Sequence, residues 1–118
     1  MGLVTPDQVT ERREFPKVHH RIFVSPAQGS QAVTMGRVVI EAGGEIPLHT
    51  HLVEDCMVVL RGRAEVHISG KTFIAGPDMG IVVPANTVHG IRNTFDEPFE
   101  ICFTWPAVNV QRFPVSQG

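Results

Sequence analysis

Short segments in which apolar and polar residues alternate make up most of the chain, and this period of two predicts β-strands. The clearest is residues 99–105, where every second side chain from Phe99 to Trp105 is apolar and faces the same side. We expect further strands at residues 18–24, 32–41, 48–53, 55–60, 64–68, 71–75, 80–83 and 88–92. Turns rich in Gly, Pro, Asn and Ser separate them, and no apolar period of 3.6 residues exceeds two turns. The pattern therefore predicts an all-β sandwich or barrel.

Regions outside the regular alternation set the domain organisation. Residues 1–31 should form an extended N-terminal arm, with one helical turn within residues 6–12, followed by a first strand. Residues 32–105 should form the barrel, and residues 106–118 an irregular C-terminal tail. The strand at 55–60 is apolar on both faces, which predicts burial against the interior and against a second sheet or a second subunit. His19 and His20 are adjacent in the first strand, and we expect both at the surface.

Composition and charge narrow the class of protein. The chain has 118 residues, 42% of them hydrophobic, and a net charge of −2, which indicates a single globular domain. Lys and Arg are scattered, so no nucleic-acid surface is expected. No apolar run approaches the roughly 18 residues of a membrane span, and no signal peptide is recognisable, so we expect a cytoplasmic protein. Cys56 and Cys102 do not form a disulfide framework.

Two histidines one residue apart, His49 and His51, are the first candidates for chemistry. In a strand their rings point to the same face with Cα atoms about 6–7 Å apart, so two ring nitrogens can reach one metal ion at roughly 2.0–2.2 Å. Asp55 has the same parity but would lie roughly 13 Å beyond His51 in a straight strand. Asp55 can therefore join the site only if the chain bends at residues 52–54.

A third histidine, His89, follows the predicted turn Pro84-Ala85-Asn86. A tight turn holds a side chain by the backbone, which suits a metal ligand. Two strand histidines alone are a weak signal, and His89 strengthens it. We expect the fold to return His89 beside the His49–His51 pair.

Together these residues resemble the two conserved motifs of the cupin family. Residues Gly43, His49, His51, Asp55 and Gly62 match the spacing of its first motif, with aspartate where glutamate is usual. Residues Pro84, His89 and Asn93 match its second motif, in which Asn86 and Asp78 take positions where glycine is usual. Asn tolerates the left-handed conformation that such a turn needs.

The resemblance implies a cupin-type double-stranded β-helix, which is a small jelly-roll barrel and is usually dimeric. Cupins hold a metal at the barrel mouth by three histidines and one glutamate. Transferred to this chain, the ligands would be His49, His51, His89 and Asp55, binding one divalent transition metal: Fe, Mn, Ni, Zn or Cu. The implied partners are a small-molecule substrate and a second subunit in a homodimer.

The open positions on such a metal could take a bidentate oxygen ligand, with Asp55 or Glu54 accepting a proton. Candidate pocket residues are Met35, Arg37, Met57, Val59, Phe99, Phe103 and Trp105. Core packing is the simpler explanation for the apolar members, and a surface position is the simpler one for Arg37.

Three functions follow. The first is a metal-dependent enzyme acting on a small oxyacid or dicarbonyl, with dioxygenase-type chemistry favoured. The second is a redox-neutral isomerase, lyase or cyclase. The third is a binding or sensor module that holds a metal and a small ligand without turnover.

Overall fold

The structure of the protein is a computed structural model that describes residues 2–116, and it consists of ten strands in two five-stranded sheets. Two short 3-10 helices, η1 (Pro6–Gln8) and η2 (Pro26–Gln28), accompany them. The strands are β1 (Val18–Val24), β2 (Thr34–Ile40), β3 (Glu45–Thr50), β4 (Asp55–Arg61), β5 (Ala64–Ile68), β6 (Lys71–Ala75), β7 (Gly80–Val83), β8 (His89–Arg92), β9 (Phe99–Trp105) and β10 (Phe113–Pro114). The predicted all-β class is confirmed.

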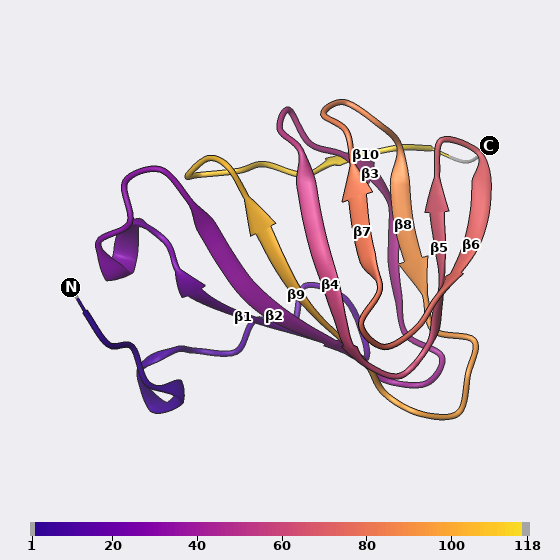
Figure 1. Ribbon diagram of the computed structural model, residues 1–118, viewed down its shortest axis with the longest axis horizontal. Helices are drawn as coiled ribbons and strands as arrows, with labels where there is room; N and C mark the ends of the chain where they lie inside the picture. The colour runs from indigo at the N-terminus through magenta and orange to yellow at the C-terminus, as the bar shows by residue number, and fades with distance from the viewer. Residues whose placement is uncertain (1, 117–118) are drawn as a thin grey trace.

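The chain passes back and forth between the two sheets. One sheet has the order β1-β2-β9-β4-β7 and the other β10-β3-β8-β5-β6. All the strand pairs are antiparallel, including the long-range pairs β2–β9 and β3–β8. Figure 1 shows the two sheets facing one another as the halves of a jelly-roll barrel, with β10 lying along the same end as β3. Among residues 2–116, no helix has the length and apolar character needed to cross a membrane.

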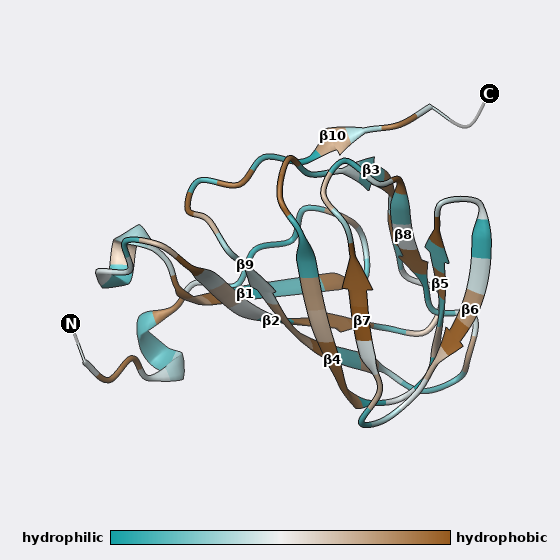
Figure 2. Ribbon diagram, turned by 45° about the horizontal axis from the view of Figure 1, so that its top comes forward, coloured by the Kyte–Doolittle hydropathy of each residue, from teal (hydrophilic) through white to brown (hydrophobic). Residues whose placement is uncertain are grey.

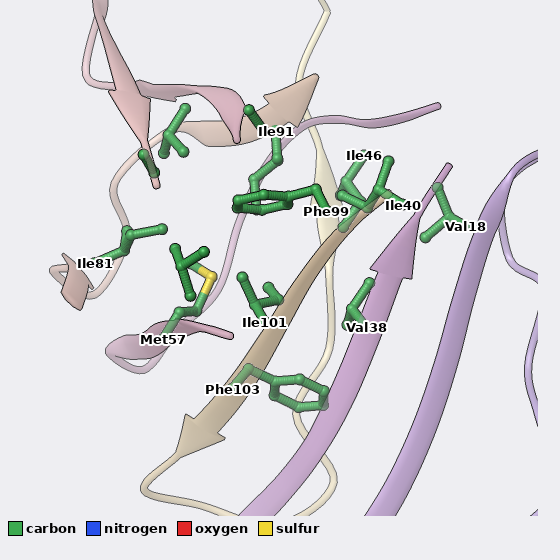
Figure 3. Close-up of a cluster of buried hydrophobic side chains, with 14 of the residues drawn as sticks. Val18, Val38, Ile40, Ile46, Met57, Ile81, Ile91, Phe99, Ile101 and Phe103 are labelled. Atoms are coloured by element: carbon green, nitrogen blue, oxygen red, sulfur yellow. The ribbon is translucent and has the colours of Figure 1, made fainter. Parts of the chain in front are cut away.

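The apolar strand faces fill the space between the sheets. Phe99, Ile40 and Val18 have no exposed surface, and Ile101 and Phe103 continue the same face of β9. Figure 3 shows these side chains in one cluster with Met57, Ile81 and Ile91. The alternation read from residues 99–105 therefore defines the interior face of β9.

Left-handed backbone conformations, and one close backbone contact, explain the motif residues around the turns. Asn86 and Asp78, which take positions where cupins usually have glycine, adopt left-handed φ angles of 61° and 67°. Gly62 also has a positive φ, and a Cβ there would lie 2.1 Å from the Pro98 carbonyl oxygen. Asn and Asp are among the residues that tolerate this conformation, whereas the contact at Gly62 admits no side chain.

The outer face of β4 is only partly covered. Val58 and Leu60 are 49% and 46% exposed, and Val82 on the neighbouring edge strand β7 is 62% exposed. In Figure 2 most of β7 is brown, the colour of hydrophobic residues. Among residues 2–116, no second sheet covers this face, so the first alternative predicted for β4 is wrong. The second alternative, a second subunit, stays a prediction.

Candidate metal centre

Four polar side chains meet inside one end of the barrel, and all are buried. His49 lies on β3, His89 begins β8, and the two residues face each other directly in the β3–β8 register. His51 follows the end of β3, and Asp55 begins β4. One ligand atom from each of the four residues lies within 4.8 Å of those of the others. The return of His89 beside the histidine pair is therefore confirmed.

The bend predicted between His51 and Asp55 is present. Residues 52 and 53 form a bend between β3 and β4, which lie in different sheets. As a result the Oδ2 atom of Asp55 lies 3.3 Å from His89 Nε2 and 3.7 Å from His51 Nε2. A straight strand would have carried this carboxylate away from the histidines.

The backbone orients all three imidazole rings in the same way. The Nδ1 atoms of His49, His51 and His89 lie 2.7, 2.8 and 2.9 Å from the carbonyl oxygens of Pro47, Gln111 and Thr87. A carbonyl oxygen only accepts hydrogen bonds, so each Nδ1 carries the hydrogen and donates it. Each neutral ring therefore presents the lone pair of Nε2 to the centre of the cluster, as a metal-binding imidazole does.

Burial favours the neutral form of His49 and of His51. It lowers the pKa of His49 to about 3 and lowers the pKa of His51 as well. His51 Nε2 and Asp55 Oδ1 are buried without a hydrogen-bond partner. Three lone pairs and a carboxylate that converge in this way require a proton or a cation between them. The donor set fits a divalent transition metal, and three imidazoles with one carboxylate suit Fe, Mn or Ni.

The four clustered residues line an inner cavity of about 30 Å³, and an outer cleft of about 610 Å³ adjoins it at lining residues that the two spaces share. The inner cavity is lined by His20, Val38, Ile46, His49, His51, Asp55, Met57, His89, Ile91, Ile101, Phe103, Trp105 and Arg112. The outer cleft is lined by Arg12, Glu14, His20, Ile22, Ser25, Pro26, Ala27, Thr34, His51, Phe103, Trp105, Asn109, Val110, Gln111 and Arg112. The two spaces share five residues, and one of them, His51, belongs to the four-residue cluster.

Three of the predicted pocket residues, Met57, Phe103 and Trp105, line the inner cavity. Val59 and Phe99 are fully buried in the hydrophobic core. Contact of any of these side chains with a substrate stays a prediction.

Met35 and Arg37 do not line the inner cavity or the outer cleft, because their parity on β2 is opposite to that of the buried Val38. The Arg37 guanidinium instead pairs with Glu100, with a distance of 2.7 Å from Nε to Oε2. Arg37 is therefore a surface arginine.

Glu54, the second candidate proton acceptor, is exposed at the bend. Its carboxylate lies 3.4 Å from the Cys56 thiol, which donates to it, and it does not line the cavity. Asp55 and Glu54 have opposite parity, so the turn that brings Asp55 inward directs Glu54 outward.

His20 corrects one expectation. It is 6% exposed and lines the inner cavity, whereas we expected it at the surface. Its parity matches that of the fully buried Val18, and this alternation was the available signal. His19, on the opposite face, pairs with Glu41 at 2.6 Å.

The C-terminal tail contributes residues that no sequence motif indicated. Gln111 supplies the carbonyl that orients His51, and Arg112 lines both the cavity and the cleft. The tail is held by β10, which pairs with β3, and by the Thr34 hydroxyl, which donates to the Ala107 carbonyl at 2.8 Å. No local sequence pattern predicts where such a tail lies in the folded protein.

Comparisons with known proteins agree with this geometry. A curated relative, the polyketide synthase CurC of Streptomyces cyaneus, is 33% identical over 85 residues, which are 70% of this chain and 55% of the relative. The chain thus spans about half the length of that relative.

Solved structures with the same fold include the polyketide cyclase RemF from Streptomyces resistomycificus. It has a TM-score of 0.81 and 22% identity over 99% of this chain and 88% of that one. An RmlC-like cupin from Shewanella frigidimarina gives a TM-score of 0.80 at 13% identity, covering 92% and 93% of the two chains. The oxalate decarboxylase of Lactobacillus farciminis gives 0.82 at 21% identity, covering 92% of this chain and 34% of that one.

The family model described as "Cupin domain" matches residues 36–105, which include all four clustered ligands. With this match and the jelly-roll architecture, the chain belongs to the cupin family.

Proposed function

We propose that the protein is a metal-dependent cupin enzyme that closes a ring in an extended polycarbonyl or phenolic substrate without net oxidation. The observation that carries this proposal is the outer cleft of about 610 Å³ that adjoins the ligand cluster. Pockets for drug-sized ligands measure about 300–1,000 Å³. The cleft therefore accommodates a molecule much larger than the small oxyacid considered from sequence.

The relatives support the same direction. The curated relative is described as a polyketide synthase and the similar solved structure as a polyketide cyclase. Polyketide chains carry the carbonyl groups that ring closure needs. The similarities to the polyketide cyclase and to the oxalate decarboxylase, at 22% and 21% identity, support the fold alone, so the curated relative at 33% identity gives the stronger indication.

In this proposal His49, His51, His89 and Asp55 hold one divalent transition metal. When bound, the ion supplies Lewis acidity toward a carbonyl oxygen of the substrate. The carbonyls of Pro47, Gln111 and Thr87 keep the three rings in the tautomer that binds.

Asp55 is the residue to which we assign proton transfer. Its Oδ1 atom is buried without a partner and faces no other protein donor. It would accept the proton of a carbon that lies between two carbonyl groups. That carbon then forms a bond to a second carbonyl carbon, whose oxygen receives a proton. The reaction balances without an oxidant, and Met57, Phe103 and Trp105 would exclude water from it.

The experiment is turnover of a linear aryl 1,3,5,7-tetraketone, in which the carbon between the first two carbonyl groups can close a six-membered ring on the last carbonyl carbon. The metal-loaded protein is assayed under argon and under air, and chromatography with mass spectrometry separates the cyclic product from the substrate. Ring closure at equal rates in both atmospheres supports the proposal. Asp55→Asn should abolish turnover, whereas Glu54→Gln should leave it unchanged, because Glu54 is exposed outside the cavity.

Dioxygenase chemistry is the second candidate, because three imidazoles with one carboxylate also suit redox-active iron. Incorporation of label from isotopic dioxygen into the product would establish it and refute the redox-neutral proposal. Saturable ligand binding without any product would instead indicate a binding or sensor module.

A further inference from the structure

The inner cavity holds polar atoms that the metal cluster does not use. Among residues 2–116, five buried side-chain polar atoms have no hydrogen-bond partner, and all five belong to residues that line this cavity. Two are His51 Nε2 and Asp55 Oδ1 of the metal cluster. The other three are His20 Nδ1, Trp105 Nε1 and Arg112 Nε.

These three atoms have a common chemistry. The N–H groups of Trp105 and Arg112 can only donate hydrogen bonds, and His20 Nδ1 donates in the tautomer that carries the hydrogen on that nitrogen. A buried donor without an acceptor is costly, so native proteins seldom leave several at one place without a reason. What is missing here is a group rich in acceptor oxygens.

We propose that His20, Trp105 and Arg112 form an anchoring site for an anionic oxygen, a carboxylate or an enolate, carried on a planar aromatic substrate. This inference rests on the proposed function, because it names the substrate class of the same site. The anionic oxygen would lie at the inner cavity of about 30 Å³, and the rings would lie in the outer cleft of about 610 Å³, which the three residues also line. The anchoring residues come from β1, the end of β9 and the tail, whereas the metal ligands come from β3, β4 and β8. One molecule can therefore contact both groups without competition for side chains.

Arg112 supplies the positive charge and is held in a defined orientation. Its Nη1 donates to Glu14, and its guanidinium carbon lies 5.1 Å from the centre of the Phe15 ring. Its side chain is only 16% exposed. Its Nε is buried without a hydrogen-bond partner and belongs to a residue that lines the cavity. An N–H of a charged group favours an anionic acceptor.

The aromatic walls account for the planar body of the ligand. The rings of Phe103 and Trp105 lie 4.7 Å apart, and that of Trp105 lies 5.0 Å from His51. Figure 3 shows Phe103 at the edge of the hydrophobic cluster, away from Phe99 and Ile91. Aromatic faces bind flat ring systems by stacking, so these residues complement a fused-ring ligand.

The test is the preference of the protein for a hydroxynaphthoate over its methyl ester, which keeps the rings and removes the negative charge. Calorimetric titration of the zinc-loaded and of the metal-free protein gives both affinities. We expect the carboxylate to bind at least about tenfold more tightly than the ester in both forms, as charged hydrogen bonds would give. Trp105 is the only tryptophan, so its fluorescence reports the same binding.

Two variants remove single donors. Trp105→Phe removes the N–H and keeps an aromatic ring, and Arg112→Gln removes the guanidinium. Each should lower the carboxylate preference about five- to tenfold while leaving the zinc content unchanged. The matched control is Arg12→Gln, because Arg12 is exposed and lines the outer cleft but not the inner cavity. It removes the same charge and should leave the preference unchanged.

An unchanged preference in both variants, or an equal loss in Arg12→Gln, would overturn the anchoring site. A preference seen only with zinc present would also overturn it, because the metal would then bind the carboxylate. Failure of the proposed function is a separate result. If no polycarbonyl is turned over but the preference is present and lost in the variants, the anchoring site stands alone.

Discussion

The two ends of the barrel interior differ in whether their buried polar groups have hydrogen-bond partners. At the end formed around Phe99, Asn93 has no exposed surface, and its side chain forms three hydrogen bonds, to Ile40, Glu97 and Phe95. At the mouth, five buried side-chain polar atoms have no partner within residues 2–116. The first end is complete by itself, whereas the mouth lacks the groups that would complete it.

The same strand connects these two ends. β9 begins with the fully buried Phe99 and ends with Trp105, whose indole N–H is unpaired. An unsatisfied buried polar group costs about 1–3 kcal/mol. We infer that the core around Phe99 supplies stability, and that the mouth uses part of it to hold side chains ready for a metal and a substrate.

Of the changes considered, truncation of the largest core side chain should have the largest effect on the free energy of unfolding. Phe99→Ala should lower the free energy of unfolding by about 3–5 kcal/mol, because it leaves a cavity in a fully buried site. Denaturant unfolding measures this. The control is Phe73→Ala, since Phe73 is 51% exposed. Equal losses in the two variants would show that the core around Phe99 does not dominate the stability of the protein.

Acidification should destabilise the protein because His20, at the barrel mouth, is buried in its neutral form. Burial lowers the pKa of His20 from 6.5 to about 4, so the unfolded chain binds a proton between these pH values that the folded chain does not. The stability from this group is complete above pH about 6.5 and is lost as the pH falls to about 4, by roughly 3 kcal/mol at most.

His20→Gln should remove this contribution. The slope of the unfolding free energy against pH should then fall by the equivalent of about one bound proton. His19 is the matched control, because hydrogen bonds to Glu41 and Glu11 raise its pKa. Its contribution is present below pH 6.5 and lost as the pH rises through the raised pKa. An unchanged slope in His20→Gln would contradict the assignment.

Binding of a metal ion at the barrel mouth should stabilise the folded protein. A divalent ion at a hundred times its Kd should raise the free energy of unfolding by about 2.7 kcal/mol and Tm by roughly 10 °C. His49→Ala and His51→Ala should abolish both this rise and the metal content found by elemental analysis. His67→Ala, on the hairpin of β5 and β6, should keep both. Metal retention in both ligand variants would refute the site.

The smallest effect on stability should come from removal of the Thr34 hydroxyl, which holds the C-terminal tail. Thr34→Val removes the hydrogen bond to Ala107 and should cost about 0.5–1.5 kcal/mol of stability. It should also weaken metal binding a few-fold, because the tail carries the Gln111 carbonyl that orients His51. Thr72→Val, which breaks a bond to His67 on the hairpin, is the control. Unchanged metal affinity would show that the Thr34 hydroxyl is not needed to position the Gln111 carbonyl.

Local sequence determined most of the strands and the placement of His49 and His51 on one face. It did not predict β10 in the tail, which was expected to be irregular, or the start of β3 at Glu45. The alternation in residues 99–105 and 64–68 predicted β9 and β5 with their observed bounds, because period-two patterning is a local property of a half-buried strand. His49 and His51 share a face for the same reason. The need for a bend before Asp55 followed from the length of an extended chain.

Tertiary structure alone decided what surrounds the ligands. The pairing of His49 with His89 is a matter of register between β3 and β8, and the arrival of Gln111 at His51 joins residues far apart in the chain. No periodicity encodes such contacts, because they depend on how whole sheets pack. His20, Arg112 and Trp105 gain a shared cavity only when β1, the tail and β9 meet at the mouth of the barrel.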